Sequence, residues 1–166
     1  TAALLARMGH SVEEGSLPDT AIDDFLPLWQ ELIGGMPLVR WSRAQPVTRW
    51  LREGAVANRR AGLDVAARYD RLLSIFAPAF ATADAWLMPT VAMTAPRVGL
   101  VDGLPPREAF FEAARLGAFT ALVNLVGLPA VSLPAGLSPE GMPIGVQLVG
   151  SMFGEADLLA VARDLE

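Results

Sequence analysis

The chain has 166 residues, of which 13 are basic and 18 acidic, giving a net charge of −5. This balance provides no cationic surface for a phosphate backbone, so nucleic-acid partners are not expected. The absence of cysteine excludes disulfides, and a single histidine cannot supply the three or four ligands of a usual zinc site. No apolar run approaches the roughly 20 residues of a membrane span. These features predict a cytoplasmic protein without cofactor, metal or membrane partner.

The N-terminal segment predicts a helix followed by a strand. A helical pattern of apolar residues runs from Thr1, and Gly9 suits the left-handed position after a helix end. The range Ser11 to Leu17 is predicted to be a weak strand. The strand that would precede the helix in such a unit is missing, so we expect the chain to be a piece of a longer protein.

A second helix is expected to start at Asp19 or Thr20, either of which can cap it, and to continue to about Ile33. The following range, 34–60, contains tryptophans and arginines and is interrupted by proline and glycine. We expect short helical pieces there, forming a variable excursion. It either covers a substrate entrance or, more simply, is partly exposed.

The middle of the chain predicts a long helix and a short buried strand. Apolar residues with helical spacing extend from Gly62 to Ala81, and Pro78 is expected to kink the last turn. The run from Ala85 to Pro89 is apolar on both faces and ends at proline, which favours a strand in a sheet covered on both sides. A loop rich in proline and glycine follows, from Thr90 to Pro106.

The last part predicts two helices, a β-hairpin and a final helix. The helices start at about Arg107 and Phe119, and two apolar runs after them are each opened by a proline and separated by a turn. Residues 153–165 then form an amphipathic helix with an acidic first turn. Helices alternating with strands predict a three-layer α/β/α arrangement with a mixed sheet. Gln147, alone among apolar neighbours on the expected central strand, is predicted to serve a structural hydrogen-bond network.

Isolated polar residues give only weak indications of chemistry. His10 follows a helix end and has no neighbouring nucleophile, so a solvated turn residue is the favoured interpretation. The pairs Glu13-Glu14 and Asp23-Asp24 point in different directions on a strand or helix, which favours a charged surface over a paired acid and base. The pair Arg59-Arg60 is interpreted as helix surface.

Two motifs and the hairpin carry a resemblance to a known family. Asp84, Pro89 and Thr90 match a pattern D-x-hydrophobic-x-x-P-T, and Phe119 to Asn124 match F-T-x-x-x-N. Together with the segment Asn124 to Gly150, they resemble the C-terminal part of amidase signature enzymes, which hydrolyse amide bonds with a serine nucleophile. The resemblance implies a substrate pocket to which Thr90, Phe119, Thr120, Val123 and Asn124 contribute. Asn124 could equally satisfy main-chain groups of the turn that follows its helix.

The chain lacks the catalytic part of that pattern. The family uses a lysine, a bridging serine and a nucleophilic serine in a glycine-rich and serine-rich loop, whereas all 13 basic residues here are arginine. Arginine cannot serve as the base because it does not deprotonate in proteins. We therefore expect residues 1–166 to be the C-terminal part of one amidase domain, with no catalytic residue of its own and no activity alone. The parent enzyme would convert carboxamides to carboxylates through a serine acyl-enzyme.

The resemblance also suggests a subgroup and leaves alternatives. Gly117 occupies the position where the corresponding subunits of tRNA-dependent amidotransferases place an aspartate that holds the amino group of glutamine, so a general amidase is favoured. The alternatives are an unrelated α/β binding domain and a non-catalytic amidase-like subunit. Hydrophobic content of 52% exceeds what a free-standing domain needs. This excess predicts contact with the missing N-terminal segment or, in a homo-oligomer, with further copies. The resemblance implies a small amide as the substrate partner.

Overall fold

The structure is a computed structural model that describes residues 1–37 and 40–165. The chain divides into two compact units. The first contains Thr1–Pro18, Ile75–Leu100 and the segment from Ala114 to the C-terminal end, and the second contains Asp19–Ser74 and Val101–Ala113. Every residue expected to form the substrate pocket belongs to the first unit.

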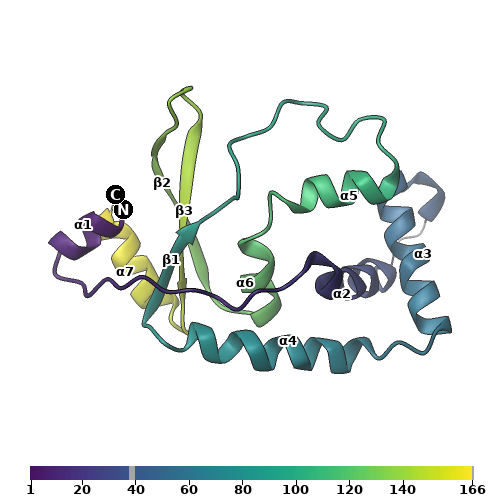
Figure 1. Ribbon diagram of the computed structural model, residues 1–166, viewed down its shortest axis with the longest axis horizontal. Helices are drawn as coiled ribbons and strands as arrows, with labels where there is room; N and C mark the ends of the chain where they lie inside the picture. The colour runs from purple at the N-terminus through teal and green to yellow at the C-terminus, as the bar shows by residue number, and fades with distance from the viewer. Residues whose placement is uncertain (38–39, 166) are drawn as a thin grey trace. The chain divides into compact units, whose positions relative to one another are not determined.

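A three-stranded antiparallel sheet organises the first unit (Figure 1). Strand β3 lies in the middle, between β1 and β2. The unit also contains helices α1, α6 and α7 and the last turns of α4. The bounds are α1 Ala2–Arg7, β1 Ala85–Pro89, α6 Thr120–Val126, β2 Ala130–Leu137, β3 Pro143–Gly150 and α7 Glu155–Leu165.

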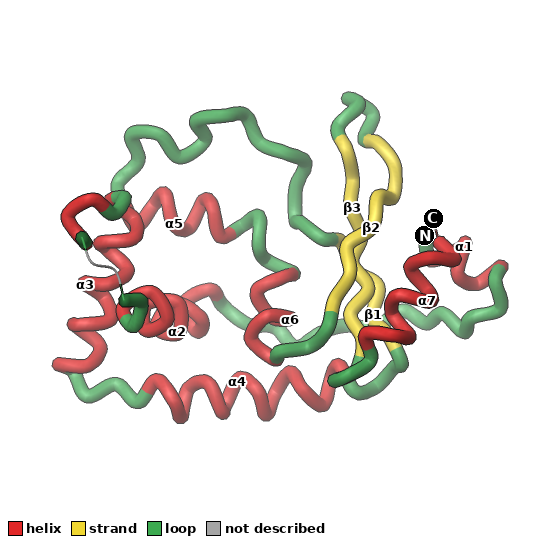
Figure 2. The backbone as a smooth tube through the Cα atoms, turned by 180° about the vertical axis from the view of Figure 1, so that it is seen from behind, coloured by secondary structure: helices red, strands yellow, loops and turns green. Residues whose placement is uncertain are grey.

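One face of the sheet packs against α7. Leu133 and Leu148 form a buried cluster with Leu158 and Ala162 of that helix. The other face carries the alternate side chains, among them the buried Val149. Figures 1 and 2 both show α7 and α6 on opposite sides of the sheet. The first unit therefore has helices on both faces of its sheet.

The second unit is helical. It contains α2 and α3, the short 3₁₀ helix η1, most of α4 and most of α5, with bounds α2 Ile22–Gly34, η1 Trp41–Arg43, α3 Pro46–Arg60, α4 Val65–Phe80 and α5 Pro106–Ala114. Buried Phe25 of α2 and Leu51 of α3 contribute to its core. The buried Gln30 accepts a hydrogen bond from Asn58 Nδ2 at 2.8 Å, which joins α2 to α3 through polar groups as well.

Three expectations about the first sixty residues were wrong. Ser11 to Leu17 forms no strand, and most of this segment is exposed. The short piece expected near Trp41 is present as η1, but Pro46 starts α3 and Gly54 lies inside it, so one continuous helix runs where a break was expected. Proline at the first helical position costs no hydrogen bond, because the N–H there has no helical partner.

Helix α2 starts after Ala21, whose N–H donates to Asp24 Oδ2 at 3.2 Å, so neither Asp19 nor Thr20 is the cap. Residues 38 and 39 of the range 34–60 lie outside the described residues.

The α/β fold class is confirmed. Strand β1 has the predicted bounds, and the hairpin forms with strands longer than its apolar runs. The pairings among the described strands are all antiparallel, so these three strands do not display a mixed sheet. Helix α4 continues past Pro78 to Phe80. Among the described residues, no helix has the length and apolar character that crossing a membrane requires.

Candidate functional site

The end of β1 carries the first motif of the candidate site. Asp84 is exposed just before the strand, and Pro89 is its last residue, paired with Val146 of β3. Thr90 continues the contact beyond the strand, because its N–H donates to the carbonyl of Gly145 at 3.1 Å. The backbone of the motif is therefore held against β3, and this contact fixes the backbone position from which the Thr90 side chain projects.

A hydroxyl bridge links the two outer strands across the middle one. The Oγ1 atom of Thr90 lies 2.7 Å from the Oγ atom of Ser132 in β2, and either hydroxyl can donate. Ser132 Oγ also approaches the carbonyl of Val146 at 3.5 Å. The bridge passes over Gly145, where an added Cβ would lie 3.1 Å from Thr90 Oγ1 and 3.6 Å from Ser132 Oγ. Glycine at this position leaves the space that the bridge needs.

Gln147 completes a polar group on the same face of the sheet. Its side chain is 2% exposed, and Nε2 donates to the carbonyl of Pro89 at 3.3 Å. Side-chain alternation places it beside Ser132 and away from the leucines that meet α7. The prediction of a structural role for the Gln147 amide on the central strand is confirmed to the extent of this one hydrogen bond, which holds the residue that precedes Thr90.

Helix α6 holds the other predicted residues, and its polar groups bond locally. Phe119 precedes the first residue of the helix, and Val123 is 4% exposed. Thr120 Oγ1 donates to the carbonyl of Gly117 at 3.3 Å, and Asn124 Nδ2 donates to the carbonyl of Thr120 at 2.8 Å. Asn124 thus bonds to main chain, as the alternative interpretation expected, but Nδ2 donates back into its own helix and not to the turn after it.

The structure thus joins Thr90 to Ser132, and it places Thr120, Val123 and Asn124 on α6 with Phe119 at the N-cap. Sequence reasoning missed Ser132. A usable signal was its position between Val131 and Leu133, which places it on the opposite face from two apolar side chains. Whether these residues contact a substrate stays a prediction.

Neutral groups dominate this site. The hydroxyls of Thr90 and Ser132 and the amide of Gln147 can donate and accept hydrogen bonds, but none of them is a base at neutral pH. The described residues contain no group of three or more His, Asp or Glu side chains that could hold a metal ion. Such a face can orient a polar ligand or hold its backbone neighbours, and proton transfer would require other residues.

Comparison with known proteins identifies the family. The family model described as Amidase matches residues 41–159, which include both motifs and the whole hairpin. The chain belongs to the amidase family. Its sequence is 34% identical to AmiC of Mycobacterium leprae (strain TN), an amidase by name, over all of this chain and 38% of that protein. It is 44% identical to a glutamyl-tRNA(Gln) amidotransferase subunit of Neisseria meningitidis over 55% of this chain and 18% of that protein.

Solved amidase-family structures have the same fold. A 6-aminohexanoate cyclic dimer hydrolase superposes with a TM-score of 0.75 and 27% identity, covering 95% of this chain and 37% of that one. A glutamyl-tRNA(Gln) amidotransferase subunit from Thermotoga maritima gives a TM-score of 0.65 at 21% identity, which supports the fold alone. The chain therefore spans well under half the length of these amidase relatives.

Proposed function

We propose that this chain is part of a serine amidase that hydrolyses carboxamides to a carboxylate and ammonia or an amine. A serine nucleophile forms an acyl-enzyme, and water then releases the acid. The observation that carries the proposal is the family match across residues 41–159, supported by 34% identity to AmiC along the whole chain. The nucleophile and its lysine would come from the part of the parent protein that these 166 residues do not include.

Within that enzyme, this chain supplies sheet strands and one wall of the acyl pocket. The bridge between Thr90 and Ser132 supports this role, because it holds the end of β1 against the hairpin at 2.7 Å. Phe119 and Val123 of α6 would add apolar wall, and Thr120 and Asn124 would hold its backbone. The pocket volume then selects the acyl group, because one methylene more or less in an apolar pocket changes the free energy that discriminates between substrates by about 1–3 kcal/mol.

We further propose that the parent acts on small amides without tRNA and functions in the cytoplasm. Gly117 carries no side chain that could hold the amino group of glutamine, and a net charge of −5 disfavours a tRNA partner. The cysteine-free composition is compatible with a reducing compartment. Exposed apolar side chains such as Leu137, at 69% exposure, support contact with the rest of the parent or with another copy.

A second function, a non-catalytic amidase-like module, is favoured by one observation, the absence of lysine from the chain. One experiment separates the two. The intact parent and the 166-residue chain are each assayed for ammonia release from aliphatic and aromatic amides, and quenched samples are weighed for an acyl adduct. We expect turnover and an adduct for the parent only. A parent that binds amides but neither turns them over nor forms an adduct would support the non-catalytic module.

A further inference from the structure

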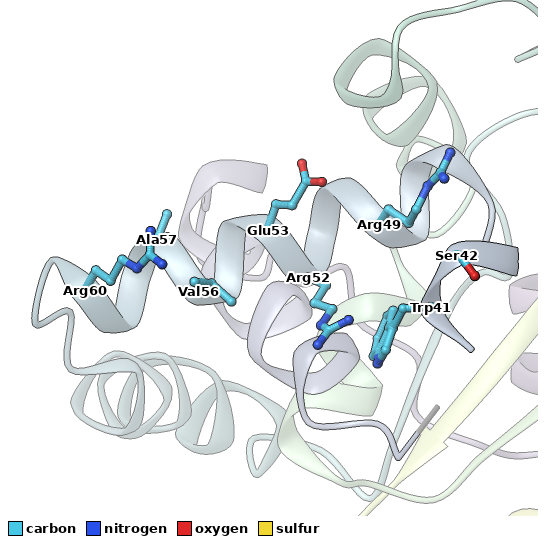
Figure 3. A pocket seen from close by; sticks show the side chains of 8 residues that line it. All are labelled: Trp41, Ser42, Arg49, Arg52, Glu53, Val56, Ala57 and Arg60. Carbon is cyan, nitrogen blue, oxygen red and sulfur yellow. The ribbon is translucent and has the colours of Figure 1, made fainter. Parts of the chain in front are cut away.

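Helix α3 has two faces of different character. One face packs on α2, with Leu51 and Ala55 buried and the Arg59 guanidinium paired with Glu31. The opposite face is exposed and carries a groove of about 460 Å³ (Figure 3). The groove is lined by Trp41, Ser42, Arg49, Arg52, Glu53, Val56, Ala57 and Arg60.

Within the part of the chain that the structure describes, the arginines of this groove have no carboxylate partner. Arg59, on the other face, is paired, but Arg49, Arg52 and Arg60 make no ion pair among the described residues. Arg52 instead stacks on Trp41, with its guanidinium carbon 4.2 Å from the ring centroid. Stacking leaves the edge of a guanidinium free to donate hydrogen bonds to an anion and restricts its orientation. The groove thus presents unsatisfied cationic donors in a chain whose net charge is −5.

The arrangement of charges limits the kind of anion. Figure 3 shows Arg49 and Arg52 towards one end of the groove and Arg60 at the other, with Val56 between. Arg60 lies eight positions after Arg52, which corresponds to about 12 Å along a helix. The carboxylate of Glu53 also lies between the ends, so a continuous polyanion such as a nucleic acid would meet repulsion there. Separate carboxylates flanking an apolar centre match this pattern.

We propose that the α3 groove binds an acidic peptide segment of a partner protein, with carboxylates at both ends of a short apolar stretch. Guanidinium groups bind carboxylates through paired N–H donors, and the apolar stretch would cover Val56 and Ala57. An extended peptide with glutamates four residues apart spans about 13 Å, which fits the separation of the two arginine groups. This binding does not depend on the amidase activity.

The test uses a fluorescein-labelled peptide, Glu-Val-Ala-Val-Glu, and the 166-residue chain. We expect anisotropy to show saturable binding at low ionic strength that is lost at roughly 0.5 M salt, where charges are screened within a few ångströms. The double variant Arg52→Gln/Arg60→Gln should bind roughly tenfold more weakly, since exposed pairs contribute up to about fivefold each. Glu53→Gln should bind roughly twofold to fivefold more tightly.

Matched controls separate the groove from overall charge. Arg71→Gln/Arg97→Gln removes the same charge from exposed positions outside the groove, and Asp70→Asn matches the change at Glu53. Both controls should leave affinity within twofold, and circular dichroism should be unchanged for all variants. Equal binding of the peptide with glutamines at its ends, or equal weakening by the arginine control, would overturn the proposal. A light-scattering mass of two chains that the groove variant abolishes would assign the groove to a second copy and overturn it as well.

Discussion

Thr90 and Ser132, which lie 42 positions apart in the sequence, meet through their hydroxyl groups at 2.7 Å over the middle strand of the sheet. The first directly follows β1 and the second lies in β2, so their bond ties the end of β1 to a strand that is not its neighbour in the sheet. Since one residue belongs to a family motif and the other to the hairpin, the bridge links two of the three segments that carry the resemblance.

The energy of this bridge can be measured with a double-mutant cycle. Thr90→Val and Ser132→Ala each remove one hydroxyl while keeping the shape of the chain nearly constant. We expect a coupling free energy of unfolding of about 0.5–1 kcal/mol, the net value of one partly solvated hydrogen bond. Urea unfolding of the unsubstituted chain, the two single variants and the double variant measures this coupling free energy. Strict additivity would mean that the two hydroxyls do not interact in solution.

Gly145→Ala tests why glycine occupies the position under the bridge. The new methyl group would lie 3.1 Å from Thr90 Oγ1, which is tighter than an ordinary contact, and the hydroxyl is held by its partner strand. We expect a loss of about 1 kcal/mol in unfolding free energy, because either the bridge or the strand must shift. The loss should nearly vanish in a Thr90→Ala/Ser132→Ala background, where the atom that meets the new methyl group is removed and only Cβ of residue 90, at 3.5 Å, remains near it. A loss of equal size in both backgrounds would assign the strain to the backbone instead.

Gly54→Ala tests the finding that α3 continues through Gly54, where a break was expected. Alanine favours a helix over glycine by about 1 kcal/mol, so the substitution would stabilise α3 if the site were open. A Cβ at Gly54 would instead overlap the side chain of Gln30, which is 7% exposed and bonded to Asn58. Overlap with a fixed buried side chain outweighs propensity, so we expect net destabilisation of about 1–3 kcal/mol.

The control for that variant is Gly35→Ala at the end of α2. Its added Cβ would lie 3.4 Å from the Glu31 carbonyl oxygen, an ordinary contact, and the backbone φ of −83° suits alanine. Thermal melts should show a lower Tm for Gly54→Ala and little change for the control. A rise in Tm for Gly54→Ala would mean that Gln30 can move aside.

The hairpin turn gives a prediction about pH. Ser138 Oγ donates to Glu140 Oε2 at 2.8 Å, and this bond, together with the backbone N–H of Glu140, lowers the pKa of that carboxyl. A lowered pKa stabilises the folded state above the usual glutamate pKa, and the contribution is lost as pH falls through the folded value. Ser138→Ala should raise the pKa of Glu140 towards the ordinary range. A carboxyl carbon NMR titration measures it, and an unchanged midpoint would contradict the role of the serine.

Local patterns predicted the elements whose ends are fixed by local chemistry. Strand β1 has its predicted bounds because a short apolar run stops at Pro89, and Gly9 has the expected positive φ of 98° after α1. Errors arose where tertiary contacts decide. Gly54 suggested a break, but it lies inside a helix, where the close approach of the Gln30 side chain leaves no room for a Cβ. Ser132 could not be paired with Thr90, because a bond between residues 42 apart depends on strand order, which the sequence pattern did not specify.

The last prediction concerns Gly117 in the parent enzyme. A Cβ at this position would lie 3.5 Å from Thr120 Oγ1 and 3.8 Å from the Ala114 carbonyl oxygen, so a side chain can be added without overlap. Under the proposed function, Gly117→Asp would place a carboxylate beside α6, where it could pair with an amino group on the substrate. We expect the kcat/KM ratio for glutamine over a neutral amide of similar size to rise roughly fivefold, the effect of one partly solvated ion pair. Gly117→Asn, which has the same shape without the charge, should leave the ratio near that of the parent. Equal effects of Asp and Asn would show that volume, and not charge, acts at this position.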